Sequence, residues 1–220
     1  MAKIILFGAN GNIGRLFLKL TASTSHQITG VIQNPDQREH LTTLNTNASF
    51  ETLSLALATS KDIQDLMTSH DAVVFTVGSR GKNLLQVDLD ATVKAFEAAT
   101  AANIKRFILI SAVYAESRAF WKDSPILNYY IAKHYADRIL EDEFPNLDYT
   151  ILKPTLLTDG EGTGKVRILP PARGDGSDQP GSIDRIDVAR VMLSILNEPS
   201  TFKASYNFAN GDVPIDKAFN

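Results

Sequence analysis

The sequence contains no cysteine, which excludes disulfide bonds, thiolate metal sites and cysteine nucleophiles at once. Its four histidines are scattered through mostly polar segments and do not form a pattern typical of metal ligands. We therefore expect no metal in the functional site.

Positive charge is also scarce, because 22 Lys and Arg stand against 25 Asp and Glu and leave a net charge of −3. Non-specific binding to nucleic acid requires a basic face, so we expect no nucleic-acid partner. No apolar run approaches the roughly 20 residues that cross a bilayer, and the first residues lead into a strand-like run rather than a signal sequence. The expectation is a cytoplasmic protein with no membrane partner.

What the sequence does contain is a regular alternation of strand-like and helix-like segments. Short apolar runs rich in β-branched residues predict strands, and longer stretches with a period of about 3.6 residues predict helices. Such alternation predicts right-handed βαβ crossovers and a parallel sheet covered on both faces. We expect strands at 3–7, 27–32, 49–55, 71–77, 105–110, 149–152 and 205–208, and helices from 13 onward, within 36–48, and at 61–68, 84–103, 128–143, 184–196 and 214–219.

The expected fold class is α/β: a Rossmann-like doubly wound parallel sheet with helices on both faces, in a single domain over 1–220. Residues 154–220 would complete the substrate side of the cleft. Within them, residues 159–182 contain six Gly and three Pro and predict a long irregular loop. That loop is a candidate lid over the cleft, although such loops also serve as plain connectors.

The segment from Gly8 to Gly14, with the sequence GANGNIG, joins the first expected strand to the first helix. Gly8 permits a tight exit from the strand, Gly11 lets the backbone approach a pyrophosphate, and Gly14 lets helix and sheet pack closely. The N-terminus of the helix then offers N–H groups and a positive dipole end to phosphates. Because the order strand, turn, helix is the context that such a motif requires, we expect a dinucleotide site here.

The choice of dinucleotide depends on the end of the second strand, where an acidic residue would bind the ribose hydroxyls of NAD. Gln33 and Asn34 stand there instead, so nothing repels the additional phosphate of NADP. Arg15 and Arg38 are the nearest candidate cations, although both are also consistent with ordinary solvated charges. We expect NADP(H) to be favoured over NAD(H).

Three polar residues predict a second, catalytic part of the site. Tyr129 and Lys133 lie four residues apart on an expected helix and share a face, so the lysine charge would lower the pKa of the phenol. Ser111 ends a buried strand, where a doubly wound sheet presents ligand contacts, and its hydroxyl would hold a substrate carbonyl. Tyr130 and Tyr114 are rivals of Tyr129 for the role of the phenol.

The segments GANGNIG, DAVVFTVGS, KRFILIS, NYYIAK and LDYTILKPTLLTD together resemble the short-chain dehydrogenase/reductase superfamily. They are most similar to its atypical NAD(P)-binding branch, which includes NmrA-like proteins and flavin and biliverdin reductase relatives. The sequence departs from that branch at Gln33, where relatives commonly carry Arg, and near Ser54, where they often carry Asp. The resemblance implies cofactor contacts from Gly8, Asn10, Gly11, Asn12 and Ile13 at the pyrophosphate, from Gly78 and Ser79, from Lys133 at the nicotinamide ribose, and from Lys153, Pro154 and Thr155 on the nicotinamide side.

These features predict an NAD(P)H-dependent oxidoreductase that acts on a small carbonyl, quinone or flavin-like acceptor, with Tyr129 as acid and base. One alternative is a non-catalytic redox sensor of the NmrA-like type, which binds NAD(P) and signals to a partner protein. A nucleotide-sugar epimerase is less favoured, because the region after Pro154 is short for a sugar-nucleotide subdomain. Trp121 and Phe120 are interpreted as packing rather than as a substrate wall. Monomer and homodimer both stay open.

Overall fold

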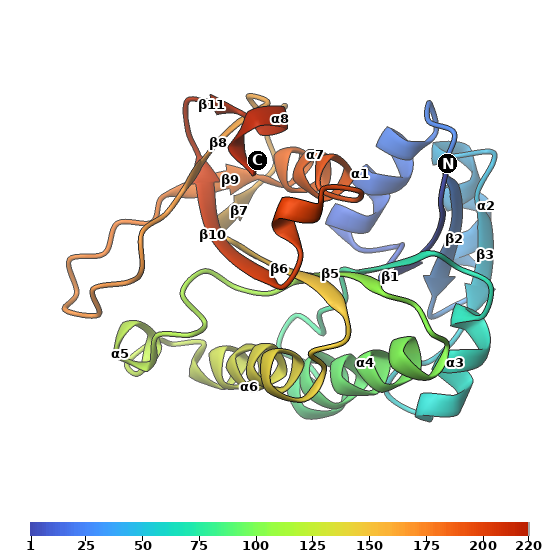
Figure 1. Cartoon of the computed structure of the whole chain (residues 1–220), viewed down its shortest axis with the longest axis horizontal. Coiled ribbons are helices and arrows are strands. Elements are labelled where there is room, and N and C mark those ends of the chain that lie inside the picture. Colours follow the sequence, from blue (N-terminus) through green and yellow to red (C-terminus); the bar gives the residue numbers. More distant parts are fainter. Residues whose placement is uncertain (220) are drawn as a thin grey trace.

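The computed structural model describes residues 1–219 and shows one large sheet between two layers of helices (Figure 1). Seven strands run parallel to one another: β1 (Lys3–Phe7), β2 (Gln27–Ile32), β3 (Ser49–Thr52), β4 (Ala72–Phe75), β5 (Arg106–Ile110), β6 (Asp148–Pro154) and β10 (Ala204–Asn210). Two antiparallel strands, β8 (Lys165–Ile168) and β11 (Val213–Pro214), extend the sheet beyond β10. A separate parallel pair consists of β7 (Leu156–Thr158) and β9 (Ser182–Asp184).

The strand order of the large sheet is β11-β8-β10-β6-β5-β4-β1-β2-β3. From β1 the chain builds outward through β2 and β3, and it then returns to build the other half from β4 onward. This is the doubly wound, Rossmann-like arrangement that the sequence predicts. Its order reverses between β1 and β4, and ligands of such sheets bind at the carboxyl ends of the strands beside this reversal.

Helices cover both faces of the sheet because side chains along β1 alternate between them. Ile4 and Leu6 pack in one apolar cluster with the first helix, whereas Ile5 and Phe7 pack in the opposite one. Each of these fully buried side chains stabilises the fold by about 1.5–3 kcal/mol. The first layer contains α1 (Asn12–Thr21), α2 (Gln37–Leu44), α7 (Arg185–Ser194) and α8 (Ile215–Ala218), and the second contains α3 (Ser60–Met67), α4 (Ala91–Ala101) and α6 (Leu127–Glu143).

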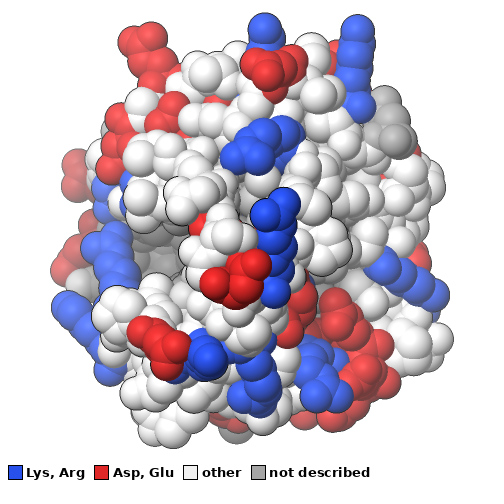
Figure 2. All heavy atoms as spheres, turned by 90° about the vertical axis from the view of Figure 1, so that its left-hand side faces the viewer, with Lys and Arg blue, Asp and Glu red and all other residues white. Residues whose placement is uncertain are grey.

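Two further short helical segments are α5 (Arg118–Trp121) and the 3-10 turn η2 (Pro199–Thr201). No helix within residues 1–219 is long and apolar enough to cross a membrane. Over the face shown in Figure 2, acidic and basic side chains are interspersed and do not form a continuous basic surface.

The expected helix over 84–103 is divided in two. It begins as a π-helical segment, η1 (Leu84–Asp90), and continues as α4. Helix propensity predicts the helical state here, but it carries no information about the wider π turn. The π segment places the carboxylate of Asp88 in the interior, where it accepts a hydrogen bond from the backbone N–H of Ser79 at 3.0 Å.

The expectation of one irregular loop over 159–182 is wrong. The segment contains β8, and Asp187 accepts hydrogen bonds from the N–H groups of Thr163 (2.7 Å) and Gly164 (3.1 Å). The glycines conceal the alternation of β8 in the sequence, and the partner Asp187 lies on α7, more than 20 residues later. Residues 159–164 and 169–181 lie outside the regular elements, and the second of these stretches makes the excursion drawn in orange beyond α5 in Figure 1.

Candidate functional site

The glycine turn places the first helix where a phosphate would bind. Gly8 has φ +83°, and a Cβ on Gly14 would lie 2.3 Å from the carbonyl oxygen of Gly8, so neither position accepts a side chain. Gly11 is the N-cap of α1 and provides no side chain to cap it. The first N–H groups of the helix have no intrahelical acceptors, so they are available to an anion.

A cavity of about 440 Å³ lies beside this turn, at the carboxyl ends of β1, β2 and β4. It combines apolar walls with a few polar groups, which is the usual composition of a cofactor site. Together with the open helix N-terminus, these residues fit a dinucleotide. The lining residues are Gly8, Asn10, Gly11, Val31, Ile32, Gln33, Gln37, Leu53, Leu55, Ala56, Thr76, Val77, Gly78, Ser79, Arg80, Lys82, Asn83 and Val87.

Some residues of the predicted cofactor set lie outside this lining. Asn34 belongs to a surface turn, where its Oδ1 accepts a hydrogen bond from the N–H of Asp36 at 3.0 Å. Asn12 is exposed at the start of α1, and the side chain of Ile13 packs in the core. At Ile13 this leaves the backbone N–H group, at the start of α1, to serve a phosphate.

The two cations suggested by the sequence are engaged elsewhere. The guanidinium of Arg38 donates to the carbonyl of Phe50 at 2.7 Å, and Arg15 Nε donates to Asn10 Oδ1 at 2.9 Å. Neither arginine lines the cavity. Their hydrogen bonds hold local structure, so this structure gives no support to either arginine as the partner of a 2′-phosphate.

Lys133 connects the cavity to the predicted catalytic residues. Its side chain is buried on α6, and its Nζ donates to the carbonyls of Ile110 (3.3 Å) and Val77 (3.5 Å), of which Val77 also lines the cavity. Burial lowers the pKa of Lys133, whereas the carboxylates of Asp88 and Asp137 act in the opposite direction. The lysine therefore lies in the interior, where burial disfavours its charged form and two nearby carboxylates favour it.

Of the three tyrosines considered from the sequence, Tyr129 is the one beside Lys133, whose Nζ lies 5.8 Å from the centroid of its ring. Tyr130 instead stacks on Trp121, with ring centroids 6.1 Å apart and an interplanar angle of 5°. Tyr114 packs edge-on against Phe120 at 4.9 Å. Helical phase alone does not exclude Tyr130, but the ring contacts distinguish all three tyrosines.

The expected direction of the pKa shift at Tyr129 is wrong for this structure. Burial raises the pKa of Tyr129, and the negative charge of Asp88 raises it further. The negative charge of Asp137 acts on Tyr129 in the same direction. The phenol therefore stays protonated at neutral pH, which suits it to donate a proton rather than to accept one.

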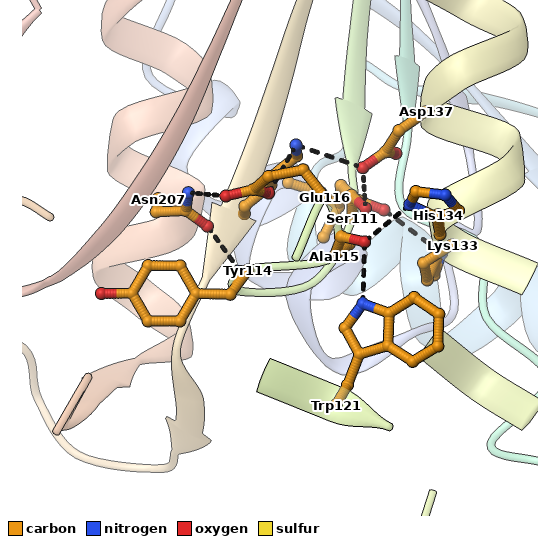
Figure 3. Close-up of polar contacts among 11 residues, drawn as sticks. Ser111, Tyr114, Ala115, Glu116, Trp121, Lys133, His134, Asp137 and Asn207 are labelled. Carbon is orange, nitrogen blue, oxygen red and sulfur yellow. Dashed lines mark hydrogen bonds and ion pairs between the residues drawn. The ribbon is translucent and has the colours of Figure 1, made fainter. Parts of the chain in front are cut away.

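Ser111 does not present its hydroxyl to the cleft. It is 3% exposed, and its Oγ donates to Asp137 Oδ2 at 2.8 Å (Figure 3). The expectation that Ser111 holds a substrate carbonyl therefore needs correction, because its proton is already engaged. A carboxylate four residues beyond Lys133 is the acceptor, and the same face of α6 carries both.

Behind Ser111 lies a network of charged groups that extends to the surface (Figure 3). Lys153 is buried, and its Nζ lies 2.9 Å from Glu116 Oε2 and 3.5 Å from Asp137 Oδ2. Glu116 is partly exposed and accepts a hydrogen bond from Asn207 Nδ2 at 2.8 Å. Lys153 thus faces carboxylates rather than an open nicotinamide side. Its neighbour Pro154 ends β6.

The sequence analysis missed the two buried carboxylates of this region, Asp88 and Asp137. Burial raises the pKa of Asp137 to about 6, although Lys153 and the bond from Ser111 both lower it. Its second oxygen, Oδ1, and the Oγ1 of Thr155 are buried without a hydrogen-bond partner within residues 1–219. The spacing from Lys133 was the only available signal for Asp137. No pattern in the sequence indicates that Asp88 is buried, because its position in the interior depends on the π-helical segment η1.

We expect Asp137 to make stability decrease as pH rises. Its native pKa of about 6 lies above the value of about 3.9 of an unfolded aspartate, so the native state binds more protons between these values. The free energy of unfolding should therefore lose about 3 kcal/mol through this group as pH rises from 4 to 7. Urea unfolding across that range should show Asp137→Asn gaining stability relative to the wild type.

The matched control for this experiment is Asp142→Asn, which removes an exposed carboxylate from the same helix. Its difference from the wild type should not follow the same pH profile. A constant difference between Asp137→Asn and the wild type from pH 4 to 7 would contradict the raised pKa of Asp137.

Comparisons with known proteins agree with this geometry. The model of a family described as NAD(P)H-binding matches residues 8–199. The chain is 36% identical over 221 residues to YhfK of Bacillus subtilis, named an uncharacterized sugar epimerase, with 98% of each chain covered. It is 29% identical to the oxidoreductase ylbE of Lactococcus lactis, with a TM-score of 0.85 over 99% of this chain and 94% of that one.

A third comparison concerns the fold alone. The chain is 20% identical to a short-chain dehydrogenase/reductase of Veillonella parvula, whose structure was determined in complex with NADP. The TM-score is 0.75, and 98% of each chain is covered.

Proposed function

The chain belongs to the NAD(P)H-binding family, and on that premise we propose that it is an NAD(P)H-dependent oxidoreductase acting on a small carbonyl, quinone or flavin-like acceptor. One observation carries the proposal. Lys133 Nζ lies beside the ring of Tyr129 and also donates to the carbonyl of Val77, a residue that lines the dinucleotide cavity. These contacts support a role in which Tyr129 donates a proton beside the bound cofactor.

The cofactor would be held along the carboxyl edge of the sheet. Backbone N–H groups at the start of α1 would bind the pyrophosphate, and the apolar walls at Val31 and Leu53 suit an adenine ring. Gly78 and Ser79 would contact the ribose, and residues 154–220 would complete the substrate side. When bound, the cofactor supplies the hydride.

The protein itself would supply the proton. Tyr129 is protonated at neutral pH and would donate its phenolic proton to the acceptor oxygen as negative charge develops there. Lys133 would favour that transfer electrostatically, because its ammonium faces the ring. Ser111 would act indirectly, by holding Asp137 in the charged network behind Lys133.

One specific observation favours a non-catalytic alternative. Ser111 already donates its hydroxyl proton to Asp137, so no serine hydroxyl at the end of β5 is free to orient a carbonyl. A protein that binds NAD(P) and signals its redox state to a partner would need no such group. The name of the Bacillus subtilis relative adds sugar epimerisation to the reactions that need testing.

The test is to incubate the wild-type protein with NADPH or NADH and a panel of quinones, flavins, aldehydes and ketones. We expect the absorbance of the reduced cofactor to fall with at least one acceptor, and calorimetry to show dinucleotide binding. Micromolar binding without turnover across the panel would favour the sensor. Conversion of a nucleotide sugar to its epimer, without net oxidation of the cofactor, would identify an epimerase instead.

A further inference from the structure

Two basic side chains line the dinucleotide cavity and have no counterpart in the predicted site. Arg80 and Lys82 belong to the loop that follows β4, and both line the same cavity as Gln33, directly after β2, and Gln37, at the start of α2. Among the described residues that line this cavity there is no Asp or Glu. The electrostatic character of the lining is therefore positive, although the chain as a whole carries a net charge of −3.

The loop that carries these cations has a fixed base. Buried Asp88 accepts a hydrogen bond from the N–H of Ser79 at 3.0 Å, and the Oγ of Ser79 accepts one from the N–H of Asn83 at 3.0 Å. The N–H of Lys82 donates to the carbonyl of Ser79 at 3.2 Å and closes the turn. The two side chains thus extend from a turn that is anchored at both ends.

The backbone at Arg80 is strained. Its φ is +54°, in the left-handed region that non-glycine residues seldom adopt, and Gly81 follows with φ +80°. Such a conformation is unfavourable for a residue with a Cβ and occurs preferentially at ligand-binding segments. A surface turn under no demand to present an arginine would tolerate glycine or asparagine at this position with less strain.

Neither cation is engaged with the protein. Within residues 1–219, the structure gives the side chains of Arg80 and Lys82 no ion pair and no hydrogen bond. In contrast, Arg38 and Arg15, which lie outside the cavity lining, are both occupied by hydrogen bonds. The free basic groups of the cavity therefore extend from the β4 side rather than from the end of β2.

We propose that Arg80 and Lys82 form the subsite for the 2′-phosphate of NADP(H), replacing a cation at the end of β2. The inference rests on the proposed binding of a dinucleotide and adds the residues that select it. A phosphate monoester carries nearly two negative charges, and a guanidinium binds two of its oxygens at once. The neutral amides of Gln33 and Gln37 would add hydrogen bonds without repelling that charge.

The test is a calorimetric comparison of NADPH with NADH, and of 2′,5′-ADP with 5′-AMP, on the wild type, Arg80→Ala, Lys82→Ala and the double variant. We expect the wild type to bind the 2′-phosphorylated member of each pair about tenfold tighter or more, as a charge-assisted contact worth about 1.4 kcal/mol requires. The double variant should bind both members about equally. Lys122→Ala, which removes an exposed cation outside the cavity, is the matched control.

Salt provides a readout that is independent of activity. Affinity of the wild type for 2′,5′-ADP should fall more steeply with ionic strength than affinity for 5′-AMP, and the double variant should lose this difference. An unchanged NADPH to NADH ratio in the double variant would overturn the assignment. Equal loss of both cofactors would also overturn it, because that result indicates contact with the adenine or the pyrophosphate. If the wild type binds neither dinucleotide, the proposed function fails and the subsite fails with it.

Discussion

Replacing Tyr129 with phenylalanine is expected to lower kcat for carbonyl reduction by about 100-fold or more, while NADPH binding stays unchanged. The ring would keep its packing beside Lys133, but the proton that the acceptor oxygen needs would be missing. Steady-state kinetics with the best acceptor of the panel, together with calorimetric NADPH binding, would measure both effects. The unaltered affinity would show that the loss arises in the chemical step and not in the cofactor site.

Tyr130→Phe is the matched control, because Tyr130 carries the same hydroxyl on the next residue but stacks on Trp121. Its activity should stay close to that of the wild type. An undiminished rate in Tyr129→Phe would remove Tyr129 from carbonyl reduction. With a flavin acceptor the expected loss is smaller, because hydride transfer to a flavin does not need a proton from this phenol.

The raised pKa of Tyr129 also predicts an asymmetry between the two directions of the reaction. The protonated phenol needed for reduction should persist above the ordinary phenol pKa of about 10, so reduction should show no loss from this group up to that pH. Oxidation of the product alcohol needs the phenolate and should be slow at neutral pH. A pH profile in which oxidation is already maximal at pH 7 would contradict this shift.

Replacing Arg106 with methionine is expected to cost about 3 kcal/mol or more of unfolding free energy, the largest stability effect that we predict. Arg106 is 7% exposed, and its guanidinium lies 4.7 Å from the centroid of the Phe202 ring. Burial lowers its pKa to about 10, so it remains a cation at neutral pH. Its hydrogen bonds reach the carbonyls of Asp148, Ile195 and Leu196 and the hydroxyls of Thr150 and Thr201.

Methionine would fill much of the volume but donate nothing, so these buried acceptors would lose their partners. Urea unfolding at pH 7 should show the loss, and Tm should fall by about 6–12 °C. Arg138→Met is the matched control, because Arg138 is exposed on α6 and pairs with Asp142 at 3.3 Å. Its change should stay below about 0.5 kcal/mol. Equal stabilities of the two variants would contradict the role assigned to Arg106.

Much of this fold could be predicted from the sequence, because apolar periodicity reports local structure directly. The bounds of β1 and β2 agree with the predicted ranges, since each is a short apolar run that ends at a turn signal. β8 was missed because its alternation spans only four residues between glycine-rich segments. A strand of that length is recognisable only by its partners, and β10 follows more than 30 residues later.

The site could be predicted where a motif is local and not where it depends on tertiary contacts. The turn from Gly8 to Gly14 carries its own geometry, and its glycines are required by the backbone. The proton of Ser111 is held by Asp137, and the loop at Arg80 is held by Asp88, through contacts between separate elements. Spacing along the chain does not encode such partners, so the direction of a pKa shift and the position of a free cation follow only from the fold.

The antiparallel end of the sheet has a consequence for the behaviour of the protein in concentrated solution. The outermost strand, β11, has two residues, and its second is Pro214, which has no N–H to donate. Such an edge offers almost no backbone to an incoming strand and so resists the edge-to-edge pairing that starts aggregation. The opposite edge, β3, has four residues and carries the charged Glu51. Both ends of the sheet are therefore poor templates for fibre growth.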